Sequence, residues 1–343
     1  VVRSEKKESH LFKQILRWLI PVAISVGAIW LILRDIELST ILGNLSKIKI
    51  EIYLFASLAY FISYALRAFC WYVLLRRKVS YKDTFFIMGS GYLLNNLFPF
   101  RLGEIGRAVL LDDPEGPTAL EVLSSVLVER VFDVFLAAVF VLSMLPRILG
   151  GGFDQRLILI FFILTIVGIA VLYLAARFRV RISGWLEGWG ARAAFIKQWV
   201  APKANQVLEG LSVLNEPGAF FLAFGSLFLS WLIAFGENYI VFQSLYPDPP
   251  FWWMIFVLSA GAFGAALPSV PAGLGVFEGV MVAAFAFLGV GADLAFTHAI
   301  VIHAIAFVYS NIFGLIGLRM RGQAMIGLYR RVTRRSPEIK PLD

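Results

Sequence analysis

The sequence predicts an all-α polytopic membrane protein with about six full transmembrane helices and two opposed re-entrant helical hairpins in an inverted-repeat arrangement. Hydrophobic residues make up 59% of the 343 residues and charged residues only 16%, whereas soluble domains carry about a quarter charged residues. A spanning helix needs roughly 20 mostly apolar residues. Long blocks without Asp, Glu, Lys or Arg occur at 18–33, 52–66, 84–100, 157–176 and 217–236. The lipid bilayer is therefore the expected solvent.

The charge distribution supports this class. The net charge of +8 comes from basic residues at the ends of the apolar blocks, which is typical of cytoplasmic loops. Nucleic acid is therefore not an expected partner. Cys70 is the one cysteine, which excludes an intrachain disulfide. The first block, Trp18–Leu33, lacks a small-residue cleavage site and is expected to be an uncleaved span.

Basic residues also predict the sides of the membrane. Five of them precede the first span: Arg3, Lys6, Lys7, Lys13 and Arg17. The loop 34–51 is nearly balanced in charge and is expected outside, and the second span, Ile52–Leu75, returns to the basic run Arg76–Lys78. The tail 319–343 is basic as well. We therefore expect a multi-pass protein of the cell (inner) membrane, with both termini in the cytoplasm.

The number of crossings constrains the first repeat, about 52–176. The chain is on the cytoplasmic side at Lys82 and again at Arg177, so it crosses an even number of times between them. Residues 119–146 and 157–176 make two good spans. The remaining block, 84–111, is broken near its middle, and its halves are too short to span at 1.5 Å per residue. It is therefore expected to be a re-entrant hairpin from the cytoplasmic side.

The second repeat, about 219–320, follows the same logic. Residues 219–246 cross outward and 294–318 cross back, so the block 251–290 begins and ends outside. It is broken by "ALPSVPAGLGVFEG", residues 266–279, and is expected to be the second hairpin; a pair of short spans satisfies the crossing count equally well. Opposed broken helices that meet at the midplane are typical of secondary transporters. The segment 178–216 mixes aromatic and basic residues, as an interfacial helix on anionic lipid does.

The two breaks are the candidate sites. Irregular backbone at membrane depth is tolerated only where it lines a cavity or is buried in protein. In each hairpin the second half-helix begins at the break, so its partly positive N-terminus points towards the membrane centre and suits a phosphate. Gly273 and Gly275 would let the backbone approach an anion closely. Asn95 and Asn96 open the stretch "NNLFPFRLGEIGR", residues 95–107, which contains the first break.

Three charges follow the first break: Arg101, Glu104 and Arg107. A charge at the bilayer centre costs roughly 2.5–3.5 kcal/mol on insertion scales, so these groups need partners. Glu104 lies three residues from each arginine, which allows a self-satisfied Arg–Glu–Arg cluster at the helix start. The alternative adds an anionic ligand, because two cations against one carboxylate leave a positive surplus.

Other intramembrane charges also have two interpretations each. Glu278 can stabilise its own helix N-terminus, or it can take a proton or a headgroup amine. The motif "ERVFD" contains Glu129, Arg130 and Asp133, which can form intrahelical ion pairs or face the cavity after the first hairpin. Arg67 can extend to the cytoplasmic surface or line the same path.

His298 and His303 are five residues apart and do not share a helix face well, so buried, hydrogen-bonded histidines are favoured over a metal site. Neither a metal nor a cofactor is expected. The candidate substrate-binding residues are Arg67, Asn95, Asn96, Arg101, Glu104, Arg107, Glu129, Arg130, Asp133, Gly273, Gly275 and Glu278.

Three motifs carry a family resemblance. In chain order, "NNLFPFRLGEIGRAVLL", "ERVFD" and "PSVPAGLGVFEG" resemble the flippase-like transmembrane family that includes the membrane half of bacterial lysylphosphatidylglycerol synthases. The family pattern often has two glycines after the last proline, whereas this chain has Pro271-Ala272-Gly273. The resemblance implies translocation of an amphipathic lipid, often with a phosphate-containing headgroup; family members are linked to aminoacylated phosphatidylglycerol, hopanoids and polyprenyl-linked sugars.

The expected function is therefore flippase-like or scramblase-like movement of a phospholipid or lipid-linked substrate between leaflets. The chain ends after a basic tail, without the soluble aminoacyl-transfer domain of the bifunctional relatives, so enzyme activity is not expected. No G-x-x-x-x-G-K-[ST] motif is present, and transport would be passive or driven by an ion or the potential. The alternatives are an integral-membrane transferase acting on a lipid-linked substrate and a lipid-binding accessory subunit. Two protein partners stay possible on the sequence: a separate lipid-modifying enzyme and a second copy of the chain.

Overall fold

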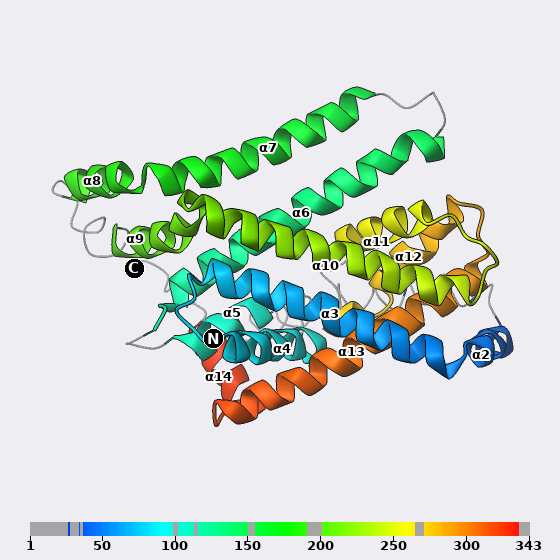
Figure 1. The fold of residues 1–343 in the computed structure, drawn as a ribbon. Helices are drawn as coiled ribbons and strands as arrows, with labels where there is room; N and C mark the ends of the chain where they lie inside the picture. Colours follow the sequence, from blue (N-terminus) through cyan, green and yellow to red (C-terminus); the bar gives the residue numbers. More distant parts are fainter. Residues whose placement is uncertain are drawn as a thin grey trace, which may run out of the picture.

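The long helices of the chain lie side by side along a roughly common direction (Figure 1). The computed structural model describes Gly27, Arg34 and residues 37–98, 102–112, 116–149, 155–190, 201–264 and 271–335. All secondary structure assigned within these residues is helical. The first predicted span, Trp18–Leu33, lies outside the described residues apart from Gly27. Arg101 and residues 266–270 of the second break also lie outside them.

The long helices agree with the apolar blocks. Their bounds are α3 Ile50–Leu74, α6 Ala119–Leu149, α7 Gln155–Arg177, α10 Pro217–Gln243 and α13 Ala292–Met320. Among the residues that could be searched, α3, α10 and α13 are long and apolar enough to cross a membrane. These three confirm the predicted spans 52–75, 219–246 and 294–318 as membrane-capable helices.

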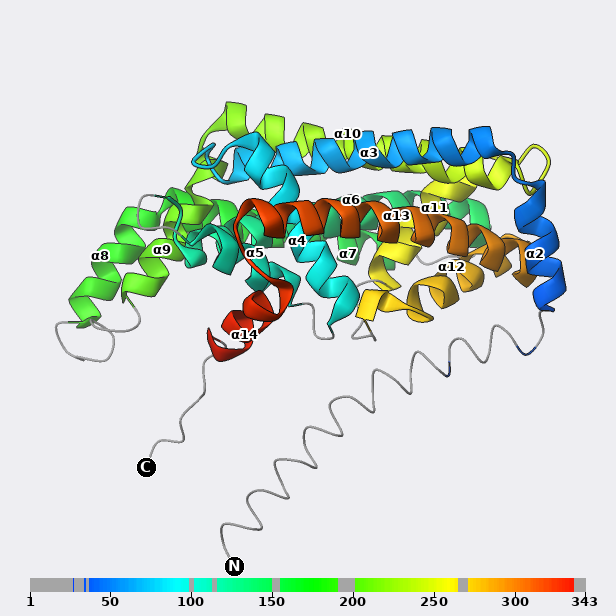
Figure 2. The same cartoon turned by 90° about the horizontal axis from the view of Figure 1, so that it is seen from below.

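Two helix pairs form the centre of the molecule. Helix α3 packs along α10, and α13 packs along α4, Tyr81–Leu97. Figures 1 and 2 show α3 and α10 side by side in both views. The α4–α13 contact is close because glycines face each other: a Cβ on Gly314 would lie 2.6 Å from the carbonyl oxygen of Gly89. Small residues permit such backbone contact between membrane helices.

The first predicted break separates α4 from α5, Gly103–Leu111. The two helices pack against each other, and a Cβ on Gly103 would collide with the carbonyl oxygen of Gly91. The backbone N–H of Gly103 donates to Asn95 Oδ1 at 2.7 Å. The side chain of Asn95 therefore satisfies a free N–H at the start of α5, so this residue closes the turn between the two helices.

The second predicted break separates α11, Trp252–Gly264, from α12, Val276–Ala286. Between them lies the short 3₁₀ helix η4, Pro271–Gly273, which packs against α4. The backbone φ is 62° at Ala272, 73° at Gly273 and 81° at Gly275. Glycine adopts positive φ freely and alanine does not, so the backbone is strained at Ala272.

Replacing Ala272 with glycine is expected to stabilise the protein by about 1 kcal/mol, because left-handed backbone costs an L-residue about 1–2 kcal/mol and part of the gain is offset by unfolded-chain entropy. Thermal unfolding of the purified protein in detergent measures the effect. Ala260→Gly, in the middle of α11, is the control and should destabilise by about 0.5–1 kcal/mol. A lower melting temperature for Ala272→Gly would contradict the prediction.

Four shorter helices complete the described fold. They are α2 Leu38–Lys47, α8 Arg179–Gly190, α9 Ala201–Leu211 and α14 Met325–Arg335. The segment 34–51, expected to be an outside loop, contains the helix α2, which packs against α13. Within the predicted basic tail, α14 packs against α5, with Leu328 and Val332 buried. Within 178–216, α9 packs against α6 and α7; its Leu208 and Leu211 are buried in protein.

Candidate functional site

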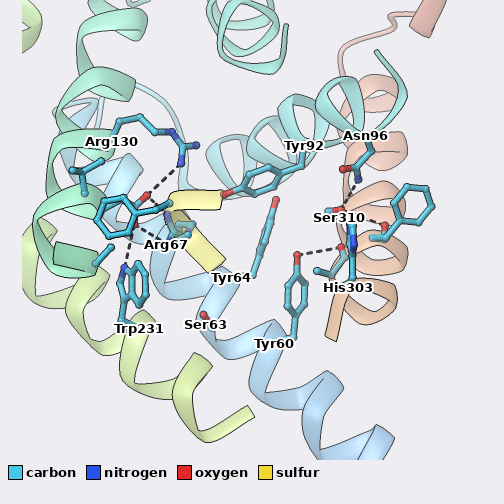
Figure 3. A pocket seen from close by; sticks show the side chains of 17 residues that line it. Tyr60, Ser63, Tyr64, Arg67, Tyr92, Asn96, Arg130, Trp231, His303 and Ser310 are labelled. Atoms are coloured by element: carbon cyan, nitrogen blue, oxygen red, sulfur yellow. Dashed lines mark hydrogen bonds and ion pairs between the residues drawn. The ribbon is translucent and has the colours of Figure 1, made fainter. Parts of the chain in front are cut away.

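A cavity of about 620 Å³ lies between α3, α4, α6, α10, α11 and α13. Its volume is in the range of small-molecule and headgroup sites, about 300–1,000 Å³. Figure 3 shows Arg67 and Arg130 on one side of it, three tyrosines in the middle, and Asn96, His303 and Ser310 on the other side. Its lining residues are Tyr60, Ser63, Tyr64, Arg67, Tyr92, Asn96, Arg130, Asp133, Val134, Ala137, Trp231, Ala262, Phe263, His303, Ala306, Phe307 and Ser310.

Arg67 and Asp133 form the ion pair at the cavity wall. The guanidinium of Arg67 donates to both carboxylate oxygens of Asp133, with Nη2 at 2.9 Å from Oδ1. Trp231 Nε1 donates to Oδ1 as well, at 3.2 Å. A bidentate pair with this additional donor is strong and fixed in orientation. Arg67 thus faces the cavity, which is the second of its two interpretations, because Asp133 on α6 holds its guanidinium there.

Behind the cavity wall, Arg107 and Glu129 form a fully buried pair. Arg107 Nη1 donates to Glu129 Oε2 at 3.1 Å, and the two side chains are 2% and 0% exposed. The guanidinium lies 4.9 Å from the ring centre of Trp71 and 5.0 Å from that of Tyr92, which adds cation–π attraction. The predicted Arg–Glu–Arg cluster is wrong for Arg107, because its ion-pair partner lies on α6 and is not Glu104.

Arg130 is the most exposed arginine of the cluster, with 34% of its side chain accessible. Its Nη1 donates to Asp133 Oδ2 at 3.3 Å, which is the intrahelical pair that the ERVFD motif predicts. Its Nε lies 3.8 Å from Glu104 Oε1, beyond hydrogen-bond distance. Among the described residues the cluster contains three arginines and three carboxylates: Arg67, Arg107, Arg130, Glu104, Glu129 and Asp133. Its formal charges therefore balance.

The two asparagines have different positions. Asn96 lines the cavity, and its Nδ2 donates to Ser310 Oγ at 3.0 Å and to Asn311 Oδ1 at 3.1 Å. It therefore links α4 to α13. Asn95 does not line the cavity; it binds the N–H of Gly103.

Glu278 connects the second break to the cavity. Its Oε2 accepts from the backbone N–H of Gly275 at 2.7 Å, and its Oε1 is hydrogen-bonded to Nδ1 of His303, a cavity-lining residue. The expected stabilisation of its own helix N-terminus is therefore present. His298 is buried elsewhere, with Nε2 at 3.0 Å from Asn238 Oδ1, so both histidines are hydrogen-bonded, as favoured. Gly273 and Gly275 belong to the second break but are not cavity-lining residues.

Arg67 is a predicted site residue, but sequence reasoning missed the rest of the polar and aromatic wall that α3 and α13 contribute. Tyr60, Ser63, Tyr64 and Arg67 follow one another at i, i+3, i+4 and i+7 on α3, which is one face of a helix. His303 and Ser310 are similarly seven residues apart. These residues could have been found in the sequence as polar side chains at helical spacing within an apolar span.

Long apolar helices around a cavity with internal ion pairs define a multi-pass helical membrane protein with a polar internal site. The family is equally clear: residues 18–314 match the lysylphosphatidylglycerol synthase TM region, and the chain belongs to this family. It is also similar to a UPF0104 membrane protein of Methanothermobacter thermautotrophicus, with 25% identity over 253 residues that cover 67% of this chain and 71% of the relative. No solved structure matches the chain. The resemblance carried by the three motifs is thus confirmed.

Proposed function

We propose that the protein moves a phospholipid or a lipid-linked anionic substrate between the leaflets of the cell membrane, as a flippase or scramblase and not as an enzyme. The proposal rests on the cavity, which brings Arg67, Arg130 and three tyrosines together among helices of which three are apolar enough to cross a bilayer. A headgroup would occupy the cavity while the acyl chains stay in lipid. Membership of a family named for the membrane part of a lipid synthase supports a lipid substrate.

The proposal includes a membrane arrangement. We infer six full spans, with the α4–α5 and α11–α12 pairs as re-entrant hairpins from opposite sides and both termini in the cytoplasm. The packing of η4 against α4 supports this arrangement, because it brings the second break next to the first half of the first hairpin. Irregular backbone at that depth then lies against protein, as hydrocarbon requires.

Arg130 is the residue we assign to the headgroup phosphate. It lines the cavity, it is the most accessible arginine of the ion-pair cluster, and its buried Nε has no hydrogen-bond partner among the residues described. Arg67 is held by both oxygens of Asp133 and has fewer donors left. A guanidinium binds phosphate strongly through parallel N–H donors.

The test is leaflet exchange of a fluorescent phosphatidylglycerol in liposomes that contain the purified full chain. Arg130→Gln is expected to slow exchange by about tenfold or more, since a hydrogen bond to a charged group contributes about 1.5–3 kcal/mol. Arg147→Gln is the matched control, because Arg147 lies on the same helix and outside the cavity; its rate should stay within about twofold of wild type. Wild-type exchange equal to empty liposomes would overturn the proposal, and lipid product formed without exchange would indicate a transferase.

A further inference from the structure

We propose that His303 and Glu278 form a proton-binding site that couples uptake of an anionic headgroup to uptake of one proton. The inference rests on the proposed function and extends it from lipid movement to proton–lipid cotransport. It follows from three features: the position of the pair between cavity and break, its hydrogen-bond directions, and the charge balance of the arginine cluster.

The pair lies between the cavity and the second break. His303 is part of the cavity wall, and Glu278 behind it is 6% exposed. The carboxylate uses one oxygen for His303 Nδ1 and the other for the N–H of Gly275. The ring of Phe277 packs edge-to-face with the imidazole at a centroid distance of 5.0 Å. A change of charge at His303 is therefore felt directly by the group that holds the break.

The hydrogen-bond directions identify the atom that takes up the proton. In the proposed site Glu278 is ionised and only accepts, so Nδ1 of His303 carries the hydrogen in the contact between them. Nε2 is then the free basic nitrogen, and within the described ranges it has no hydrogen-bond partner. A proton that binds Nε2 produces an imidazolium whose charge is stabilised by the adjacent carboxylate. Histidine is the side chain suited to this change near neutral pH.

Charge balance supplies the reason for coupling. The three arginines and three carboxylates of the described cluster leave no surplus positive charge for an incoming anion. A phosphodiester that enters the cavity therefore brings one uncompensated negative charge into a low-dielectric site. Protonation of Nε2 adds one positive charge to the wall of the same cavity. The transferred unit, one lipid anion with one proton, is then electrically neutral.

Other ionisable groups lie in the same region, and their contribution to any pH dependence must be distinguished from that of His303 and Glu278. The ionisable residues that line the same cavity are Tyr60, Tyr64 and Arg67 of α3, Tyr92 of α4, and Arg130 and Asp133 of α6. Glu237 and Tyr239 of α10, Lys47 of α2, and His298 and Tyr309 of α13 lie on α13 or on helices packed against it. The described residues of α11 have no ionisable side chain. Glu237 is the strongest competitor, because it is buried and its Oε1 has no hydrogen-bond partner among the residues described.

The experiment measures binding and transport separately as pH changes from about 5.5 to about 8. Binding of a fluorescent phosphatidylglycerol to the full chain in detergent should tighten as pH falls, with Kd changing by up to about tenfold per pH unit for one linked proton. In liposomes, a pH-sensitive dye in the lumen should report one proton per lipid transferred. His303→Gln keeps a donor for Glu278 and should make both binding and transport independent of pH.

Two further variants assign the effect. Glu278→Gln keeps an acceptor for Gly275 but removes the carboxylate that pairs with the imidazolium, and it should weaken the pH dependence of binding. His298→Gln and Glu237→Gln should keep the wild-type slope. Loss of the slope in Glu237→Gln, or a slope retained in His303→Gln, overturns the proton site. Exchange that is fast and independent of pH in the wild type overturns the coupling and leaves lipid translocation intact. Binding that depends on pH without any exchange overturns the proposed function and the cotransport, and leaves only proton-linked binding of the headgroup.

Discussion

Replacing Arg107 with alanine is expected to destabilise the protein by about 3–5 kcal/mol, the usual cost of removing one partner of a buried ion pair. Glu129 is fully buried, and its 3.1 Å bond to Arg107 is its shortest ionic contact; the arginines at 3.5 and 4.0 Å are more distant. The substitution also removes a guanidinium packed between Trp71 and Tyr92. Equilibrium unfolding in mixed detergent micelles measures the loss of free energy.

The control for this prediction removes both charges. The double variant Arg107→Met, Glu129→Leu leaves no unpaired charge and should recover much of the lost stability, because an apolar pair of similar volume is often as stable as a buried ion pair. If Arg107→Ala unfolds at the same denaturing detergent concentration as the wild type, the buried pair does not contribute to stability, which contradicts the prediction. Leaflet exchange should be measured only on variants that remain folded.

Replacing Gly314 with valine is expected to destabilise the protein by at least about 3 kcal/mol, at or beyond the upper end of ordinary overpacking. A Cβ there would lie 2.6 Å from the carbonyl oxygen of Gly89 and 2.6 Å from Leu93 Cβ. Both atoms belong to the neighbouring helix, and backbone cannot move aside as a flexible side chain can. The helices α4 and α13 would have to separate, which opens the contact that places Asn96 against Ser310.

Gly225→Val is the matched control, because it makes the same change in α10 at a position where an added Cβ meets nothing within 4 Å. Its thermal stability in detergent should stay within about 1 kcal/mol of wild type. Similar losses in both variants would mean that glycine replacement as such, and not the α4–α13 contact, causes the effect.

Much of the arrangement could be predicted from local sequence. Uncharged blocks located the helices α3, α10 and α13, and the Pro/Gly stretches located both interruptions. Arg67, Asn96, Arg130 and Asp133 were named as site residues and line the cavity. The helices α2 and α14 were missed because short amphipathic helices next to charged loops have no hydropathy block of their own.

Partner choice within the site could not be predicted. Arg107 and Glu104 are three residues apart and suggested a local pair, but Arg107 bonds Glu129, which is 22 positions away. Arg67 and Asp133 are 66 positions apart, and Glu278 and His303 are 25 apart. Helix packing brings these groups together, and sequence spacing contains no information on that distance.

By itself the sequence determined that this is a helical, multi-pass membrane protein of a lipid-synthase-related family, with interruptions near residues 100 and 270. Those properties depend on hydropathy and on proline and glycine, which act within a few residues along the chain. The tertiary structure alone decided that the charges of the described residues balance in one cluster, that a cavity separates this cluster from His303, and that Glu278 joins this histidine to the second break. These features depend on which helix faces meet, because a buried charge in hydrocarbon takes its partner from whichever helix packs beside it.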